Sequence, residues 1–504
     1  MTDTFNLITK PWINVTYLNN SSKTISLDKL FTDANEIKEL NGDSKVQDLS
    51  ILRLLLAILT TVYNKTSDPM QTWKTLYQIK NFDDVITYLH KHKDQFDFLG
   101  NKPFYQVNKE TFSKYAKISP TTGTLLIKQL NRSINESNSS LNTTSYISNL
   151  SKNKIELPEL IRWIITYQNV SAVTDKVKID KTQAIDSGVI ASIRPLYLKG
   201  TTLAETLILN LILKPNQSSK PIWEQDSDNY IKHRINNYYP DNIPEWYTTL
   251  SRMIYIEYTD NQPLIHVAGF PKLDLINQFV EPMTTWNFVS HKGKDPINGF
   301  LPESFNLKSN KYQRALWRSF GLYVNENQKE DHLPGIIQWI HKLEEEEILP
   351  IDFKLPLASI VSVNNGGATS QTPILEITDQ LKFNLNLAFE NQFVLNDLIT
   401  KLQTAGSYLG LFGTNIDKLY GTSTKIQIVQ TYYQILNDEF NHWFENLTND
   451  NFDPSIWKDK IIKLANKIMF DIMQNLQFKL DVNEKSMFDY KNVTLYKIRK
   501  EFND

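Results

Sequence analysis

The sequence predicts an α+β protein, with a large mixed α/β N-terminal domain over residues 1–385 and a C-terminal four-helix bundle over residues 386–504. Three observations predict this fold class. The chain has 504 residues, well beyond the roughly 250–300 at which a single hydrophobic core stops growing. Its composition, 41% hydrophobic and 22% charged, is that of a globular protein with ample core. After about residue 390 the apolar residues repeat at helical spacing.

Short strands and helices alternate in the N-terminal region. Ser44, with Gln47 three residues later, marks the start of a helix that is apolar almost all round and therefore buried. Several pairs of short runs rich in apolar and β-branched residues flank turn sequences, which indicates hairpins. The paired runs are 12–18 with 23–27, 252–258 with 264–267, and the two arms of 356–377. The tip of the last hairpin, Asn364-Asn365-Gly366-Gly367, is rich in residues that tolerate positive φ.

The C-terminal region contains four amphipathic segments joined by short links with Gly, Asp, Asn or Pro. This pattern is typical of an antiparallel helical bundle. The segments are 394–405, 429–443, 461–472 and 493–502.

Several classes of site are excluded by composition. The chain has no cysteine, which excludes disulfides, thiolate zinc sites, iron–sulfur clusters and cysteine nucleophiles. The N-terminus has neither a basic nor an apolar region of a secretory signal. The longest apolar stretch, Leu49 to Tyr63, is interrupted by Arg53 and is shorter than the roughly 20 residues of a membrane span. We therefore expect a cytoplasmic protein that is not bound to a membrane.

No catalytic or metal-binding pattern is present either. His90 and His92 would point apart on a helix, and Glu344 to Glu347 would spread around one, so solvated helix faces explain both. Walker A, dinucleotide-binding and nucleophile-elbow motifs are missing. We expect no enzyme activity, no metal and no cofactor. An active site assembled from distant residues leaves no such pattern and stays open as an alternative.

Charge does not by itself indicate nucleic acid. The chain has 54 Lys and Arg against 56 Asp and Glu, whereas a protein that binds DNA alone over a long footprint usually has a basic excess. Either the partner is not nucleic acid, or the contact is a local patch within a larger assembly. Two loops, 176–188 and 286–296, carry basic and polar groups, and the hairpin tip carries amides and hydroxyls. An amide-tipped hairpin can enter a minor groove or press between base pairs.

The long polar segment 131–153 cannot bury enough surface to offset its ordering entropy. A loop of this length is either functional or a mobile surface feature.

Several segments, in order along the chain, resemble a known family. The opening Phe5-Asn-Leu-Ile-Thr-Lys-Pro-Trp-Ile-Asn-Val15 and the segment Phe96-Asp-Phe-Leu-Gly-Asn-Lys-Pro-Phe-Tyr-Gln106 are similar to the large-subunit family of the type I-E CRISPR Cascade complex, called CasA. Leu160 to Gln168, Leu250 to Ile256, Leu316 to Ser319 and Leu495 to Glu501 resemble further segments of that family. The likeness spans essentially the whole chain.

The resemblance implies a non-catalytic subunit in antiviral defense that recognises the protospacer-adjacent motif (PAM) from the minor groove. In the family, a glycine-rich loop, a lysine and a hairpin glutamine do this, and the glutamine wedges the duplex open to begin the R-loop. Here Ser370-Gln371-Thr372 matches the wedge, with Gln371 as the leading candidate. The chain departs from the family in two places: only Gly188 is glycine within residues 180–188, and Asn277 aligns with the lysine. The implied DNA-contacting residues are Gln371, Ser370, Thr372, Asn364, Asn365, Asn277, Lys181, Gly188, Lys292 and Lys294.

The resemblance also implies partners. The segment 131–153, with Asn135, Asn138 and Asn142, would contact crRNA and the neighbouring backbone subunit. The other partners would be double-stranded DNA, the small Cascade subunits, and a helicase–nuclease recruited after the R-loop forms. The alternative is a purely structural scaffold subunit that makes no base-specific contacts.

Overall fold

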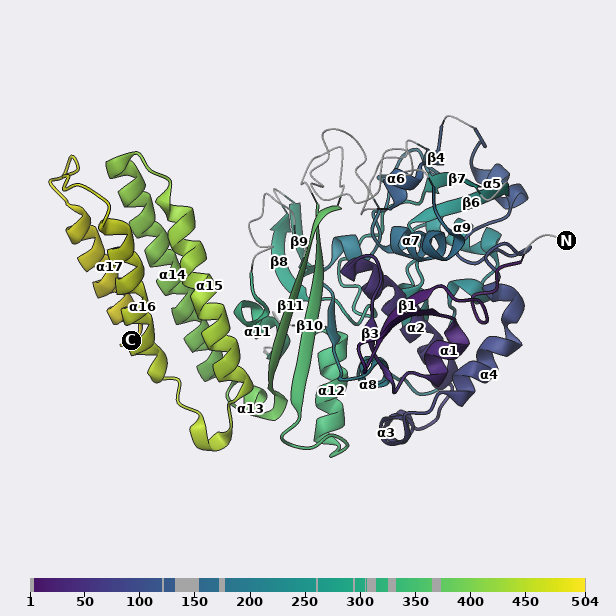
Figure 1. Cartoon of the computed structure of the whole chain (residues 1–504), viewed down its shortest axis with the longest axis horizontal. Helices are drawn as coiled ribbons and strands as arrows, with labels where there is room; N and C mark the ends of the chain where they lie inside the picture. Colours follow the sequence, from purple (N-terminus) through teal and green to yellow (C-terminus); the bar gives the residue numbers. More distant parts are fainter. Residues whose placement is uncertain are drawn as a thin grey trace. The chain divides into compact units, whose positions relative to one another are not determined.

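The computed structural model describes residues 4–119, 122–131, 154–171, 177–259, 262–292, 295–303, 305, 314–324, 332–364 and 373–503. The chain forms two compact units (Figure 1). Unit 1 comprises Met1–Gln313, Asn327–Ile348 and Leu357–Asp379, and unit 2 comprises Arg314–Glu326, Leu349–Pro356 and Gln380–Asp504. The mixed α+β fold class with a C-terminal helical region is confirmed, whereas the domain boundary at residues 385/386 stays a prediction.

Among the described residues, four small sheets lie wholly or mainly in unit 1. The sheets have the strand orders β2-β1-β3, β4-β7-β6, β11-β10-β5 and β8-β9. The strands are β1 (Ile13–Tyr17), β2 (Ser22–Ile25), β3 (Ile37–Leu40), β4 (Thr124–Leu125), β5 (Leu196–Leu198), β6 (Arg252–Thr259), β7 (Gln262–Gly269), β8 (Trp286–Lys292), β9 (Asp295–Pro302), β10 (Lys354–Asn364) and β11 (Pro373–Asn384). Two of the predicted hairpins are thus β1–β2 and β6–β7, both antiparallel. The third predicted hairpin is formed by β10 and β11. The ends of these two strands that lie away from the turn belong to unit 2.

In the described part of unit 1, the α-helices are α1 (Leu27–Thr32), α2 (Lys45–Tyr63), α3 (Pro69–Ile79), α4 (Asp83–Lys91), α5 (Lys109–Tyr115), α6 (Ile127–Leu130), α7 (Leu157–Asn169), α8 (Leu203–Leu209), α9 (Ser227–Ile235), α10 (Ile243–Tyr247) and α12 (Gly335–Glu345). Helix α2 is the core of the unit. Its N-cap is Ser44, whose hydroxyl accepts from the N–H of Gln47, as the sequence predicts. Within the described part of the chain, α2 is the one helix long and apolar enough to cross a membrane, but 94% of that stretch is buried in the protein. This burial is that of a core helix.

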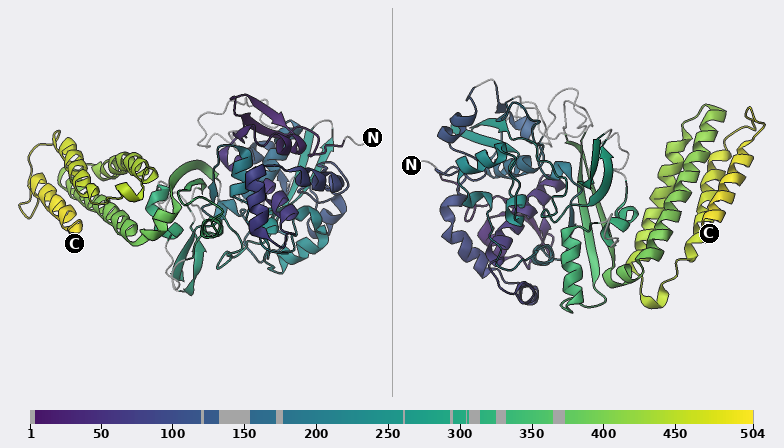
Figure 2. Two further views of the ribbon diagram at one scale, coloured as in Figure 1. Left: turned by 90° about the horizontal axis from the view of Figure 1, so that it is seen from below. Right: turned by 180° about the vertical axis from the view of Figure 1, so that it is seen from behind.

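Unit 2 is mainly helical, and Figure 2 shows its long helices lying side by side. They are α14 (Gln392–Tyr420), α15 (Thr424–Glu445), α16 (Ile456–Met473) and α17 (Met487–Glu501). Each contains one of the predicted amphipathic segments or most of it. The short helices η5 (Leu316–Ser319), α11 (Gly321–Val324), α13 (Leu385–Glu390) and η6 (Asn449–Asn451) also belong to unit 2.

Candidate nucleic-acid interface

The β10–β11 hairpin is built on a buried central strand. β10 lies between β11 and β5, with Leu357 opposite Leu198 and Ser359 opposite Leu196. The Ser359 hydroxyl donates to the Pro195 carbonyl over 2.8 Å. Further toward the tip, Val361 and Val363 are buried against Phe305, with Ile377 of β11 packed on the same cluster. The base of the hairpin is therefore fixed by both backbone pairing and apolar packing.

The hairpin tip itself is not described. Gln371, Ser370, Thr372 and Asn365 lie outside the described residues. Asn364 is the last residue of β10 and is half-buried. The predicted contact of these five residues with DNA remains a prediction.

Glu376, which follows Gln371 in the segment that resembles the family's wedge, makes a contact that the sequence does not predict. Glu376 of β11 accepts hydrogen bonds through Oε2 from the backbone N–H groups of Lys45 (2.9 Å) and Val46 (3.3 Å) at the start of α2. The Ser44 hydroxyl also bonds to this carboxylate. No local pattern indicates this contact, because 331 positions separate Glu376 from Lys45.

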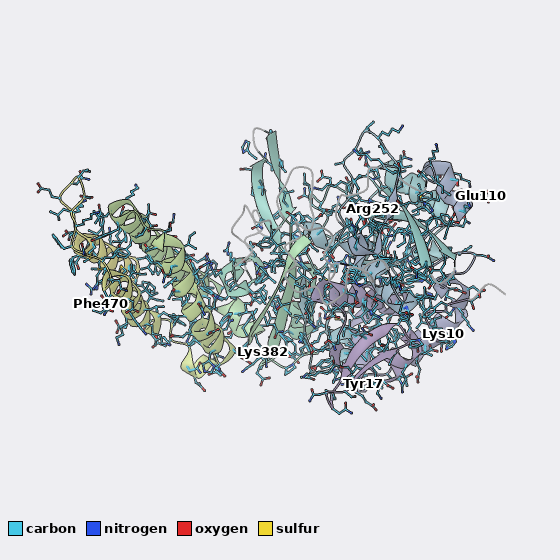
Figure 3. The ribbon with its side chains drawn as sticks, turned by 45° about the horizontal axis from the view of Figure 1, so that its top comes forward. Lys10, Tyr17, Glu110, Arg252, Lys382 and Phe470 are labelled. Atoms are coloured by element: carbon cyan, nitrogen blue, oxygen red, sulfur yellow. The ribbon has the colours of Figure 1, made fainter. Side chains whose placement is uncertain are left out.

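The loop before Gly188 is held by a buried carboxylate. Asp186 pairs with Arg234 over 2.9 Å, and both side chains are almost fully buried. A guanidinium nitrogen of Arg252, labelled in Figure 3, donates to the Asp186 carbonyl. The Asp186 carboxylate also accepts from the N–H of Gly188 over 2.9 Å. Two arginines thus fix the backbone that leads into Gly188.

Gly188 has a packing reason to be glycine. Its φ is +91°, and an added Cβ would overlap the backbone carbonyl of Asn169 at the end of α7. The residue is buried. The glycine therefore allows a close approach of the loop to α7, whatever else the loop contacts.

Lys181 stands on a tight exposed turn in the same loop. The Asp180 carboxylate accepts from the Thr182 N–H (2.8 Å) and hydroxyl (2.7 Å) and from the Gln183 amide (3.0 Å). The hydrogen bonds from Thr182 lower the pKa of Asp180 below its usual value. A carboxylate that stays ionised keeps the turn closed, so Lys181 is presented to solvent on an ordered segment.

The β8–β9 hairpin is a separate two-stranded ribbon. At its base Arg194 pairs with Glu303 over 3.3 Å, and both side chains are buried. Asn277, in the left-handed region at φ +56°, accepts through Oδ1 from the N–H of Phe300 (2.8 Å) and donates its own N–H to the Phe300 carbonyl (3.0 Å). Its amide oxygen therefore supports β9, although the residue is exposed. Lys292 ends β8, and Lys294 lies outside the described residues.

The loop that contains Gly188 and the two hairpins, β8–β9 and β10–β11, are connected at the ends of the hairpins away from their tips. Pro195 forms a bridge with Thr284 just before β8, and the Leu196 N–H donates to the Met283 carbonyl over 2.7 Å. Leu196 also pairs with Ser359 of β10. The segment that follows Gly188 therefore joins both hairpins, and Figure 1 shows the tip-side ends of both hairpins at the upper edge of unit 1. The structure brings the bases of the predicted elements together.

The predicted RNA-contacting segment is described only at its flanks. Asn135, Asn138 and Asn142 lie outside the described residues. On the flanks, the Asn131 amide donates to a carboxylate oxygen of Glu159 in α7 over 2.7 Å, which ties the two ends of the segment together. Among the described residues no group of three or more His, Asp or Glu side chains could hold a metal ion.

Comparison with known proteins gives consistent similarities. Residues 6–474 match the family model described as CRISPR-associated protein Cse1. Among solved structures, Cse1 of Thermobifida fusca is 20% identical, with a TM-score of 0.77, 99% of this chain and 97% of that chain covered. CasA of Thermus thermophilus is 16% identical, with a TM-score of 0.72, 99% of this chain and 100% of that chain covered.

A chain of a structure described as a CRISPR RNA-guided surveillance complex is 12% identical, with a TM-score of 0.71 and coverage of 99% of this chain and 100% of that chain. At these identities the structural matches establish the fold. A comparison with curated protein sequences gives no match.

Proposed function

Because the chain belongs to the CRISPR-associated protein Cse1 family, we propose that it is the large, non-catalytic subunit of a type I-E crRNA-guided complex that surveys DNA. A structural relative lies in a complex described as a CRISPR RNA-guided surveillance complex, which supports a place for this chain in such an assembly. Its partners would be crRNA, the backbone and small Cascade subunits, and double-stranded target DNA. A helicase–nuclease would dock after R-loop formation.

Within that complex, the chain would recognise the PAM from the minor groove and open the duplex beside it. The observation that carries this proposal is the fixed base of the β10–β11 hairpin, where β10 is paired on both edges and Val361 and Val363 are buried. Unstacking one base step costs about a few kcal/mol. A flexible hairpin would bend instead of separating the DNA strands. A hairpin whose central strand is packed in the core can resist this bending.

The remaining contacts would be short and shared with other subunits. Lys181, Gly188, Asn277, Lys292 and Lys294 would lie along the DNA beside the hairpin tip. Minor-groove recognition distinguishes A·T from G·C and little more, and base pairing with the guide supplies the rest of the specificity. Near-neutral net charge fits this division of work, because partner subunits can neutralise most phosphates.

The segment 131–153 would contact crRNA and the adjacent backbone subunit through Asn135, Asn138 and Asn142. Its length and polarity suit an extended polar contact. The tie between Asn131 and Glu159 would fix where the segment leaves unit 1.

The test is Gln371→Ala in the assembled complex. We expect association with a PAM-bearing duplex to slow about tenfold or more, since each 1.4 kcal/mol of lost opening energy corresponds to about a factor of ten. Association with a target already unpaired beside the PAM should hardly change, because no wedge is needed there. Gln262→Ala, an exposed glutamine at the end of another hairpin, is the matched control and should behave as the wild type.

Two other outcomes point to the alternatives. Equal binding of both targets by Gln371→Ala and the wild type would favour the scaffold subunit without base-specific contacts. Cleavage of DNA by the isolated chain with Mg²⁺ or Mn²⁺ would overturn the non-catalytic assignment.

A further inference from the structure

Helix α2 offers an immobile anchor to the β10–β11 hairpin. Almost all of α2 is buried, and its first turn is held by several polar contacts. Lys45 pairs with Asp48 over 2.8 Å, and the Asp48 carboxylate accepts from the Gly42 N–H over 2.6 Å. Arg162 of α7 donates to the Gln47 side chain over 3.2 Å. The start of α2 therefore cannot move without disturbing the core of unit 1.

Glu376 attaches the hairpin to this anchor. The residue as a whole is exposed, but its Oε2 atom lies within 2.9 Å of the Lys45 nitrogen and 3.3 Å of the Val46 nitrogen. The first N–H groups of a helix have no partner within the helix, and they carry the positive end of its dipole. An ionised carboxylate that accepts from two of them forms a charge-assisted contact.

Glu376 lies close to the hairpin tip, and its contact with α2 is on the opposite face of β11 from the apolar cluster. Successive side chains of a strand point to opposite faces. Ile377 faces the cluster of Phe305, Val361 and Val363, so Glu376 faces the other way, toward α2. Glu376 lies five positions after Gln371 in the sequence, so the chain between them can span at most about 18 Å. Contacts on both faces therefore hold the hairpin within a few residues of the predicted wedge.

We propose that Glu376 is a positioning residue, which sets the direction in which the hairpin tip leaves unit 1. One part of this inference rests on the proposed function: the expectation that a misdirected tip would open duplex DNA more slowly. Its structural part, the attachment of the arms to α2, holds or fails by itself.

The structural part is tested in the full-length free protein by hydrogen exchange with mass spectrometry. Glu376→Ala should accelerate exchange in peptides that cover residues 43–48 and in both hairpin arms, 357–364 and 373–379. Glu376→Gln should give intermediate rates, because its amide oxygen can still accept a hydrogen bond without the charge. Thr378→Ala is the matched control, since Thr378 lies two residues further along the same strand and is exposed. Faster exchange at 43–48 with unchanged arms would overturn the proposal.

The consequence is tested in the assembled complex with the two targets described above. We expect Glu376→Ala to slow association with the PAM-bearing duplex about tenfold or more, the size expected for one charge-assisted hydrogen bond. Association with the pre-opened target should stay as in the wild type, and Glu376→Gln should recover part of the loss. A general folding defect would instead weaken binding of both targets equally and would count against a positioning role.

The two proposals fail in different ways. If Gln371→Ala leaves the ratio of duplex to pre-opened binding unchanged, the proposed wedge is wrong, and hydrogen exchange still decides whether Glu376 holds the hairpin. If Gln371→Ala changes that ratio but Glu376→Ala does not, the wedge stands and the positioning role is overturned.

Discussion

At the residue scale, three arginine–carboxylate pairs are buried within the described part of unit 1. They are Arg53–Glu281, Arg194–Glu303 and Arg234–Asp186, and none of the six side chains is more than 6% exposed. Removing one member of such a pair leaves an uncompensated buried charge, which costs about 3–5 kcal/mol. Arg194–Glu303 lies at the base of the β8–β9 hairpin, and Arg234–Asp186 holds the loop before Gly188. Buried ion pairs of the core therefore position two elements of the candidate interface.

Gly188 allows a sharp prediction at this scale. Gly188→Ala should destabilise unit 1 by the penalty for a Cβ at positive φ, about 1–2 kcal/mol, and by overpacking against Asn169, about 1–3 kcal/mol more. Gly421→Ala is the control, because Gly421 has φ +68° but no atom within 4 Å of an added Cβ, so it carries only the first cost. Denaturant titration of both variants measures the difference, and equal losses of stability would contradict the close approach to Asn169.

At the scale of elements, helix α14 shows packing overriding helix propensity. The predicted segment ends at residue 405, and Gly406, Gly410 and Gly413 follow. Glycine within a helix costs about 1 kcal/mol relative to alanine, yet α14 continues to Tyr420. The three glycines lie at helical spacing and face α15, since the nearest atoms to their added Cβ positions belong to Tyr433, Val429 and Lys425. Gly413 lets the two helix backbones approach closely, because its added Cβ would meet the Lys425 Cα.

Replacing two of these glycines with alanine should have opposite effects on the stability of the bundle. At Gly413 an added Cβ would lie 2.6 Å from the Lys425 Cα, so Gly413→Ala should destabilise the bundle by about 1–3 kcal/mol. At Gly410 the nearest atom is a methyl group of Val429 at 3.4 Å, an ordinary contact, so Gly410→Ala should stabilise the bundle by about 0.5–1 kcal/mol. Thermal unfolding monitored by helical circular dichroism compares them. The same sign for both variants would contradict the packing described here.

At the scale of the whole molecule, unit 2 contains chain segments that precede its long helices by many residues. Trp317 in η5 stacks on Phe440 of α15 with ring centroids 4.5 Å apart, and its indole donates to Asn437 over 2.8 Å. Phe320 packs edge-on against Phe444 at 5.2 Å. The core of unit 2 is therefore completed by residues that lie outside the predicted bundle range of 386–504.

We predict that Trp317→Ala destabilises unit 2 by about 3–5 kcal/mol, the usual cost of truncating a buried tryptophan. In the full-length protein, hydrogen exchange should accelerate in α14 and α15 and stay unchanged in α2. Trp73→Ala is the matched variant, because Trp73 is equally buried in unit 1 and donates to the Ile208 carbonyl over 2.9 Å. It should accelerate exchange in unit 1 and leave α14 and α15 unchanged. Faster exchange of α14 and α15 in Trp73→Ala, or its absence in Trp317→Ala, would contradict the division.

The amino-acid sequence by itself determined the features that depend on neighbouring residues. The Ser44 cap, the hairpins β1–β2 and β6–β7, the four long helices and the fold class follow from turn residues, capping residues and the spacing of apolar side chains. The ordered set of local segments also sufficed to indicate the family, which the family match confirms. The contacts of Gln371 and the other predicted site residues stay predictions.

Tertiary structure alone decided which distant residues meet. Arg53 and Glu281 are 228 positions apart, and Glu376 and Lys45 are 331 apart. A charged residue in the sequence looks the same whether it is solvated or buried against a partner, because its environment is set by how complete elements pack. The length of α14 and the assembly of unit 2 from three segments depend on that packing for the same reason: their stability comes from contacts that exist only once the chain has folded.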